Sequence, residues 1–330
     1  MNFAQRHELE RKTPLRISFS DILYAPMLNE LTFAAKYLLG RDRANRYFKV
    51  HPDDTFLVSY PRSGSTWSRF LVANLVFPNE DVSFANLDRL VPATASVSRR
   101  MLERTPRPRI IKCHNYFDHR YRKVIYIVRD PRDVVLSEYR LALKRRRIPE
   151  GYPIEDYVAR FIRGEVNDYS SWKENVGSWL AARGNTDGFL LLRYEDMVGQ
   201  PAVQLARIAR FLTIDAAPQR LAAAVERSSA DRMRELEKKQ GEMWIVTKGH
   251  RKDVPFVGEA TAGAWKTQLP AACAAQIGNA WGSLLETLKY EPSGSTCELV
   301  TTAYASSDYL RTSGETAGVS SFATSTNGSM

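Results

Sequence analysis

The sequence has few cysteines. The three that it has, Cys113, Cys273 and Cys297, are unevenly spaced and form no Cys-x-x-Cys pair. Such a set excludes a disulfide framework and argues against a cysteine-ligated zinc site. No His, Cys and Asp cluster with ligand spacing is present either, so we expect no metal. Free thiols fit a reducing compartment, and we expect a cytoplasmic protein.

A long apolar run is also absent. The start MNFAQRHELERKT has no hydrophobic core of a signal peptide, and the most apolar early stretch, residues 22–39, is interrupted by Asn29, Glu30 and Lys36. We therefore expect neither a signal peptide nor a membrane span. The interruptions fall where an amphipathic helix places its polar face, which predicts that residues 1–50 form a helical segment packing on the domain.

Acidic residues are outnumbered by basic ones, 37 to 47, which gives a formal charge of +10. A basic surface attracts anions, and a nucleic acid, an anionic lipid and a phosphorylated cofactor all fit. The densest basic run, Lys144–Arg147, is typical of a solvated helix end, although it would also suit an acidic acceptor or nucleic acid. No nucleic-acid-binding module accompanies it, so we expect no nucleic-acid partner.

What is present is an alternation of strands and helices. The 330 residues are 44% hydrophobic, which is enough for one α/β domain. Apolar runs predict strands at Thr55–Tyr60, Ile110–Cys113, Lys123–Val128 and Phe189–Arg193, and helical patterns follow at Thr66–Val76, Val134–Lys144 and Val203–Leu212. The runs lack polar alternation, which predicts a mostly parallel sheet covered by helices on both faces. Ligands bind such sheets at the carboxyl ends of the strands.

The segment YPRSGSTW, Tyr60–Trp67, leaves the first strand and opens a helix. Backbone N–H groups and the helix dipole bind a phosphate in this setting. Ser65 follows Gly64 where kinases and GTPases carry a Lys. The cation of the loop, Arg62, precedes the Gly, which favours a diphosphate-like anhydride over the magnesium–ATP of a kinase. An ordinary strand-to-helix turn with Thr66 as the helix cap is the alternative.

A second loop of the same kind follows the third strand. In VRDPRDVVLS, Arg129 stands at the strand end and Ser137 in the next helix, where they can hold a second anion. Two such loops at one sheet edge predict a ligand that is phosphorylated in two places. Alternatively, Asp130 and Asp133 cap the helix and pair with the two arginines at the surface, and for Arg132 we favour this ion pair.

Of the five histidines, only His114 ends a predicted strand. Side chains alternate across a strand, so Lys112 and His114 are predicted to point into one site and Cys113 away from it. Histidine is the side chain best suited to accept a proton near neutral pH. A packing or hydrogen-bonding role for His114 is the alternative.

Five segments in this order, YPRSGSTW, IIKCH, VIYIVRDPRDVVLSEY, LLLRYEDM and AGAWK, resemble the sulfotransferases that depend on 3'-phosphoadenosine 5'-phosphosulfate (PAPS). The resemblance covers most of residues 55–290. It implies a single-domain α/β fold, a P-loop-like parallel sheet of about five strands flanked by helices, which we place at residues 51–292. The Ser- and Thr-rich stretch 293–330 is too poor in large apolar residues to order itself. The implied activity is transfer of a sulfuryl group from PAPS to a hydroxyl or amine without a metal.

The resemblance also implies a role for individual residues. It assigns to the 5'-phosphosulfate the loop residues Arg62, Ser63, Gly64, Ser65 and Thr66. It assigns Arg129 and Ser137 to the 3'-phosphate. It assigns Trp67, Tyr194 and Ser228 to the nucleoside. The implied general base is His114, and Lys112 and Arg62 neutralise charge on the sulfuryl and leaving-group oxygens.

The sequence departs from the family at several places. Arg62 stands where Lys is more common, which keeps the charge but changes its geometry. Gly258 and Glu259 replace an Arg-Lys pair of the 3'-phosphate site, Ala230 replaces an aromatic residue over the adenine, and TQLPAACAAQ lacks a common dimerisation motif. A nucleotide-binding relative with little turnover is therefore the alternative function. No readable pattern encodes the acceptor, for which a small molecule, a lipid or a carbohydrate fits, or the oligomeric state.

Overall fold

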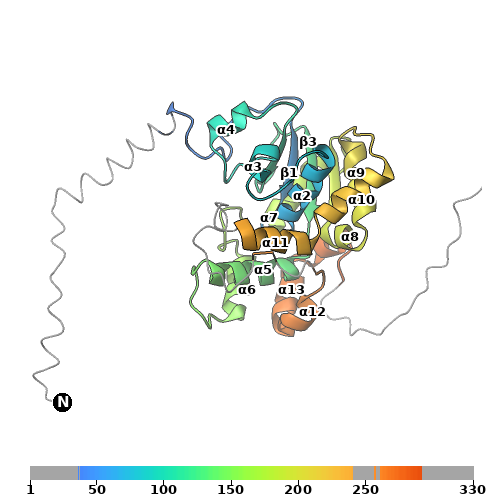
Figure 1. Ribbon diagram of the computed structural model, residues 1–330. Coiled ribbons are helices and arrows are strands. Elements are labelled where there is room, and N and C mark those ends of the chain that lie inside the picture. The colour runs from blue at the N-terminus through green and yellow to red at the C-terminus, as the bar shows by residue number, and fades with distance from the viewer. Residues whose placement is uncertain (1–35, 37, 241–255, 258–260, 292–330) are drawn as a thin grey trace, which may run out of the picture. The chain divides into compact units, whose positions relative to one another are not determined.

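A computed structural model describes residues 36, 38–240, 256–257 and 261–291, which belong to one compact unit (Figure 1). The predictions for most of the N-terminal segment, for Gly258 and Glu259, and for the tail 293–330 lie outside the described residues. Residues 39–50 form turns and one bridge rather than a helix, and Ala44 and Phe48 pack into the core as expected for this segment.

The sheet has four parallel strands in the order β2-β1-β3-β4. They are β1 (Thr55–Ser59), β2 (Ile110–Cys113), β3 (Lys123–Val128) and β4 (Phe189–Arg193). All four lie where the apolar runs predicted them. The expectation of about five strands is wrong for the described residues, because the sequence supplies only these four β-rich apolar runs and the fifth rested on the resemblance alone.

Helices cover both faces of this sheet (Figure 1). One face packs against α2 (Ser65–Val76), α3 (Leu87–Leu90), α9 (Pro201–Phe211), α10 (Pro218–Arg227) and α11 (Ala230–Gln240). The other face packs against α5 (Pro131–Lys144), α6 (Ile154–Ile162), α7 (Trp172–Arg183) and α13 (Ala271–Thr287). Shorter helices complete the unit: α4 (Arg99–Arg104), α8 (Tyr194–Gly199) and α12 (Trp265–Gln268).

Alternation along the strands divides the core into two layers. Leu57 and Ile125 face the α2 side, whereas Phe56, Val58 and Tyr126 face the α5 side. Every residue of β1 is buried, as the absence of polar alternation predicted, but β4 is an edge strand in which only one of five residues is fully buried. The central strands therefore form a rigid platform whose carboxyl ends carry the loops.

Helix α7 holds the loops at the ends of two strands. The indole of Trp172 donates to the backbone carbonyl of Arg129 at 3.2 Å, and that of Trp179 donates to the carbonyl of Asn115 at 2.9 Å. Asn175, fully buried between them, donates to the carbonyl of His114 at 2.9 Å. Buried polar groups need such partners, so these three side chains fix the backbone on which the site is built.

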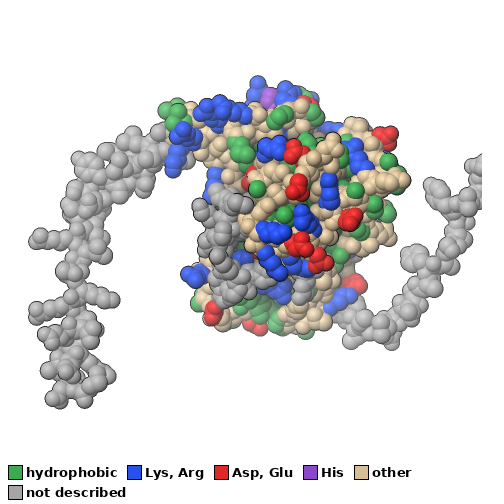
Figure 2. All heavy atoms as spheres, in the orientation of Figure 1, with side chains coloured by type: hydrophobic (Ala, Val, Ile, Leu, Met, Phe, Trp, Pro, Cys, Tyr) green, Lys and Arg blue, Asp and Glu red, His purple; other side chains and the backbone are tan. Residues whose placement is uncertain are grey.

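None of the described helices is long and apolar enough to cross a membrane. Basic and acidic side chains are interspersed over the described part of the face that Figure 2 shows. On α11, for example, Arg232 pairs with Glu235 and Arg234 with Asp231. The positive charge is therefore not gathered into one patch on this face.

Candidate active site

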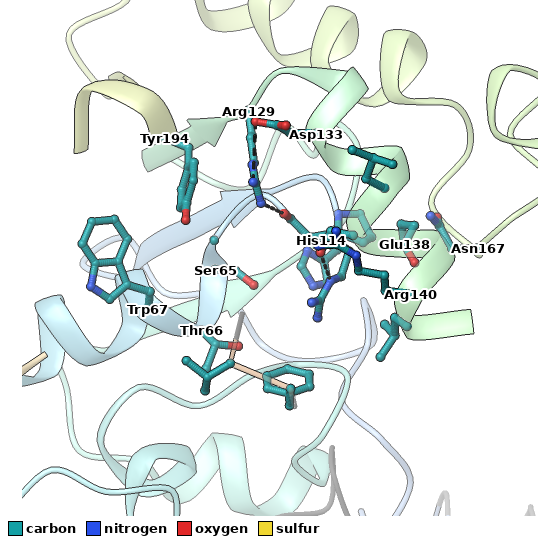
Figure 3. Close-up of a pocket in the computed structure, with 18 of the residues that line it drawn as sticks. Ser65, Thr66, Trp67, His114, Arg129, Asp133, Glu138, Arg140, Asn167 and Tyr194 are labelled. Atoms are coloured by element: carbon teal, nitrogen blue, oxygen red, sulfur yellow. Dashed lines mark hydrogen bonds and ion pairs between the residues drawn. The ribbon is translucent and has the colours of Figure 1, made fainter. Parts of the chain in front are cut away.

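The carboxyl ends of the four strands meet along one edge of the sheet, because the strands are parallel and in register. The phosphate loop follows β1, His114 follows β2, Arg129 follows β3 and Tyr194 follows β4. Residues from all four strand ends line one cavity of about 680 Å³, and Figure 3 shows several of them converging on it. The structure thus brings together segments that are distant in the chain, with Arg62 and Tyr194 separated by 132 residues.

The first loop has the backbone of an anion cradle. Arg62 and Gly64 have φ angles of 65° and 85°, and Gly64 is the residue that precedes α2. The alternative with Thr66 as the helix cap is wrong, because α2 begins at Ser65 after the left-handed glycine. The first N–H groups of a helix have no partner within it and point to the loop. The buried Ser63 hydroxyl also has no partner among the described residues, so the cradle has spare donors for an anion.

Arg62 connects the two loops. Its Nε donates to the Ser137 hydroxyl at 2.8 Å, and its backbone carbonyl accepts from Arg129 at 3.3 Å. Burial lowers the pKa of Arg62, while the nearby Glu138 carboxylate opposes that effect. An arginine remains charged in such surroundings, so a buried cation stands between the two predicted phosphate sites.

Arg129 spans the second loop. It donates to the carbonyl of Thr261 at 3.0 Å, lies 3.7 Å from the Asp133 carboxylate and stacks at 4.4 Å over the ring of Tyr194. Its Nε is buried, and no residue in the described part of the chain accepts from it. A guanidinium held in this way has a donor left for an anion, as the prediction of a second anion site requires.

The two acidic residues of this loop, Asp130 and Asp133, were predicted to cap the helix and to pair with arginines at the surface. The structure differs from this prediction. Asp130 does cap α5 by accepting from the N–H of Arg132, but the ion pair between the two is buried, with 1% of the Arg132 side chain exposed and Trp265 3.6 Å away. Asp133 does not cap α5; its carboxylate accepts from the N–H groups of Gly263 and Trp265 at 2.7 and 2.9 Å, at the start of α12. The surface location was wrong because the segment around Trp265 packs over this loop.

Lys112 and His114 point to the same side of β2, as predicted. The Lys112 ammonium contacts Nε2 of His114, and both residues line the cavity, whereas Cys113 is buried in the core on the other side. Nδ1 of His114 lies 2.7 Å from the carbonyl of Ser59. A carbonyl only accepts, so Nδ1 carries the proton and Nε2 presents its lone pair.

Burial decides the charge of both groups. It lowers the pKa of His114 well below its ordinary value, with further lowering by the Lys112 ammonium. Burial together with Arg69 lowers the pKa of Lys112 to about 7. His114 is therefore neutral near pH 7 and able to accept a proton.

Two aromatic rings form the end of the cavity farthest from Glu138 (Figure 3). Trp67 and Tyr194 make an edge-to-face pair with centroids 5.9 Å apart, and Ala230 lines the cavity beside them. The Trp67 indole donates to the backbone carbonyl of Ser228 at 3.0 Å, but the Ser228 hydroxyl is buried and bonded to Asn74 and to the carbonyl of Ala224. Ser228 therefore orients Trp67 through its backbone.

The opposite end of the cavity contains residues that the sequence did not single out. They are Glu138, Asn167 and Tyr169, with the Tyr169 ring 5.2 Å from that of His114. The interpretation of Lys144–Arg147 as a solvated helix end holds for the exposed Arg146 and Arg147 but is wrong for Lys144, which is buried beside Glu237 at 3.6 Å. Arg145 and Arg147 also line the cavity. Only a tertiary contact could reveal this, because a run of four cations carries no periodic signal.

Within the described residues, no group of three or more His, Cys, Asp or Glu side chains is placed to hold a metal. The two described cysteines, Cys113 and Cys273, are buried free thiols.

A parallel α/β sheet with two anion loops and a Lys–His pair at one edge defines an enzyme that transfers a group from a nucleotide-like donor. The sulfotransferase domain matches residues 52–289, and the chain belongs to this family. It is 29% identical over 242 residues to sulfotransferase 1B1 of Canis lupus familiaris, covering 68% of this chain and 81% of that one. It is 27% identical over 245 residues to 3-beta-hydroxysteroid sulfotransferase of Cavia porcellus, covering 70% and 83%.

The fold is also similar to that of mouse sulfotransferase SULT7A1 in complex with PAP. The TM-score is 0.58 at 21% identity, and the similarity covers 72% of this chain and 86% of that one.

Proposed function

We propose that this sulfotransferase takes the sulfuryl group from PAPS and transfers it to a hydroxyl or amine of a small molecule, with His114 as the general base. One observation carries the proposal: Nε2 of His114 carries a lone pair and lines a cavity together with two candidate anion loops, which Arg62 of the first loop connects through Ser137. Such an arrangement suits an anhydride donor with a second phosphate and a neutral base beside the transferred group.

The residues present fit the donor. The N–H groups of Ser65 and Thr66 and the charge of Arg62 suit the 5'-phosphosulfate, because the start of α2 is electropositive. Arg129 and Ser137 suit the 3'-phosphate through a guanidinium and a hydroxyl on the second loop. The adenine would lie between Trp67 and the helix that begins at Ala230.

His114 and Lys112 would divide the chemistry. His114 keeps its Nδ1 proton on the carbonyl of Ser59, so Nε2 is the atom that accepts the proton of the acceptor hydroxyl. Lys112 carries three donors on a flexible stem and can turn from Nε2 to the sulfuryl oxygens. Together with Arg62 it offsets the negative charge that develops on the leaving oxygen.

The relatives named above include one described as acting on a 3-beta-hydroxysteroid. A cytoplasmic location of this chain remains a prediction.

The test compares transfer with binding. Purified protein is incubated with radiolabelled PAPS and a panel of phenols, alcohols and amines, and adenosine 3',5'-bisphosphate (PAP) is titrated by calorimetry. We expect both sulfated product and PAP binding. Binding without any product would favour the alternative of a nucleotide-binding relative with little turnover, and loss of both would contradict the proposal.

A further inference from the structure

The cavity has a donor end and an acceptor end. In Figure 3, Trp67 and Tyr194 lie on one side and Glu138, Arg140 and Asn167 on the other, with His114 between them. On the proposed function, the aromatic side holds the nucleoside of the donor. The acceptor must approach the base from the side of Glu138, so its chemistry is determined by the residues at that end.

The acceptor end is charged. Glu138 lies midway along α5 with 6% of its surface exposed, and Arg145 and Arg147 lie in the turn that follows the helix. The turn is fixed by its backbone: Arg145 donates to the carbonyl of Leu141 at 2.9 Å and Arg147 to that of Ala142 at 2.8 Å. Both guanidiniums line the cavity and are carried by an anchored backbone.

These two guanidiniums have no partner among the described residues. Neither makes a side-chain hydrogen bond or ion pair, and Nε of Arg145 is buried without an acceptor. Two buried arginines of the described structure do have carboxylate partners, Arg69 with Asp88 and Arg109 with Asp54, whereas Arg145 is half-buried and Arg147 is exposed. Burial and the neighbouring Arg147 lower the pKa of Arg145, which shows that the two cations repel each other.

The nearby acids do not neutralise the cluster. Glu138 interacts with Arg62 as well as with Arg145 and Arg147, so one carboxylate faces three guanidiniums. Arg62 is committed to the donor on the proposed function. The exposed Asp168 and Arg43 also line the cavity and offset each other in charge. The exposed Arg140 lines the cavity on the same side, so Arg140, Arg145 and Arg147 against Glu138 leave two positive charges at the acceptor end once Arg62 is assigned to the donor.

We propose that the acceptor carries an anionic group, a carboxylate, sulfate or phosphate, in addition to the hydroxyl or amine that receives the sulfuryl group, and that Arg145 and Arg147 bind this anion. The proposal rests on the proposed function and names the acceptor class. A purely apolar acceptor would desolvate the half-buried guanidinium of Arg145 further without pairing it, which is unfavourable, and would give the exposed Arg147 no partner. A planar carboxylate or a tetrahedral sulfate or phosphate matches the forked donors of arginine.

The first experiment compares three phenols that differ mainly in charge: 4-hydroxyphenylacetate, 4-ethylphenol and tyramine. Sulfate transfer is measured at saturating radiolabelled PAPS. We expect kcat/KM for the anion to exceed that for the neutral phenol by about tenfold or more, as for a hydrogen bond to a charged group, with tyramine lowest. If no phenol is sulfated but PAP binds, calorimetric titration of the three phenols into the PAP complex must give the same order.

The second experiment assigns the preference to the two arginines. Arg145→Gln combined with Arg147→Gln should remove the advantage of 4-hydroxyphenylacetate while changing the rate with 4-ethylphenol little, and Arg147→Glu should favour tyramine. Arg146→Gln is the control, because Arg146 lies between the two arginines and does not line the cavity. That variant loses one charge from the same turn, as each single Arg→Gln change at position 145 or 147 does, and should keep the wild-type preference.

Three results would overturn the inference. They are a wild-type preference for 4-ethylphenol or tyramine, an unchanged preference in the double variant, and a loss of PAP affinity in the double variant as large as the loss of acceptor selectivity. The last would mean that these arginines bind the donor. If the proposed function itself is wrong, the protein will show neither PAP binding nor transfer to any acceptor.

Discussion

The ring of Tyr194 lies directly against Gly64, so that a Cβ at Gly64 would come within 2.5 Å of Cδ2 and Cε2 of the tyrosine. The contact joins the loop after β1 to the end of β4. Gly64 also has a φ of 85°, which side chains rarely adopt. Two independent constraints therefore require glycine at this position, and the phosphate loop depends on both.

Gly64→Ala should displace either the loop or the tyrosine. We expect PAP affinity to fall by at least about tenfold and the melting temperature to drop, because overpacking adds to backbone strain. Gly151→Ala is the control, since Gly151 has a φ of 76° and nothing within 4 Å of the added Cβ. Calorimetry and thermal unfolding measure both effects. Equal losses in the two variants would show that strain alone, and not contact with Tyr194, matters.

Arg129→Ala should weaken PAP by roughly 1.5–3 kcal/mol, the range for a hydrogen bond to a charged group. Adenosine 5'-phosphate lacks the 3'-phosphate, so its affinity should hardly change. The comparison is made by calorimetry with both nucleotides. Should the two affinities fall equally, Arg129 would not bind the 3'-phosphate and would act through its contacts with Tyr194 and Thr261.

The alkaline limb of the pH–rate profile should reflect the titration of Lys112. The pKa of its ammonium is lowered to about 7, so the cation is present below that pH and lost above it. Because the donor is anionic, kcat/KM for PAPS should fall as pH rises through this range in the free enzyme. In Lys112→Arg the charge persists, and the alkaline limb should move to higher pH. If the alkaline limb stays at the same pH in this variant, a group other than Lys112 causes it.

The sequence predicted the strands and the two loops well because their signals are local. A buried parallel strand is a short apolar run, and Gly64, Pro131 and Asp130 mark helix starts within a few residues. The pairing of Lys112 with His114 followed from strand alternation alone. These features depend on neighbours in the chain and need no tertiary information.

The burial and the partners of the polar and charged residues in the site could not be predicted in the same way. Lys144 and Arg132 look like surface residues until Glu237 and Trp265, which come from distant segments, pack against them. Ser228 was assigned to the nucleoside by resemblance, whereas the fold uses its hydroxyl for Asn74 and Ala224 and its carbonyl for Trp67. Burial decides these roles, and burial depends on the whole fold.

The most direct test of the central claim is sulfate transfer by His114→Ala. A base acts in the transition state and contributes little to nucleotide binding, so we expect turnover to fall on the order of a hundredfold or more while PAP affinity stays close to wild type. Turnover is measured with radiolabelled PAPS on the best acceptor of the panel, and affinity by calorimetry on the same preparation. Near wild-type turnover in this variant would contradict the assignment of His114 as the base.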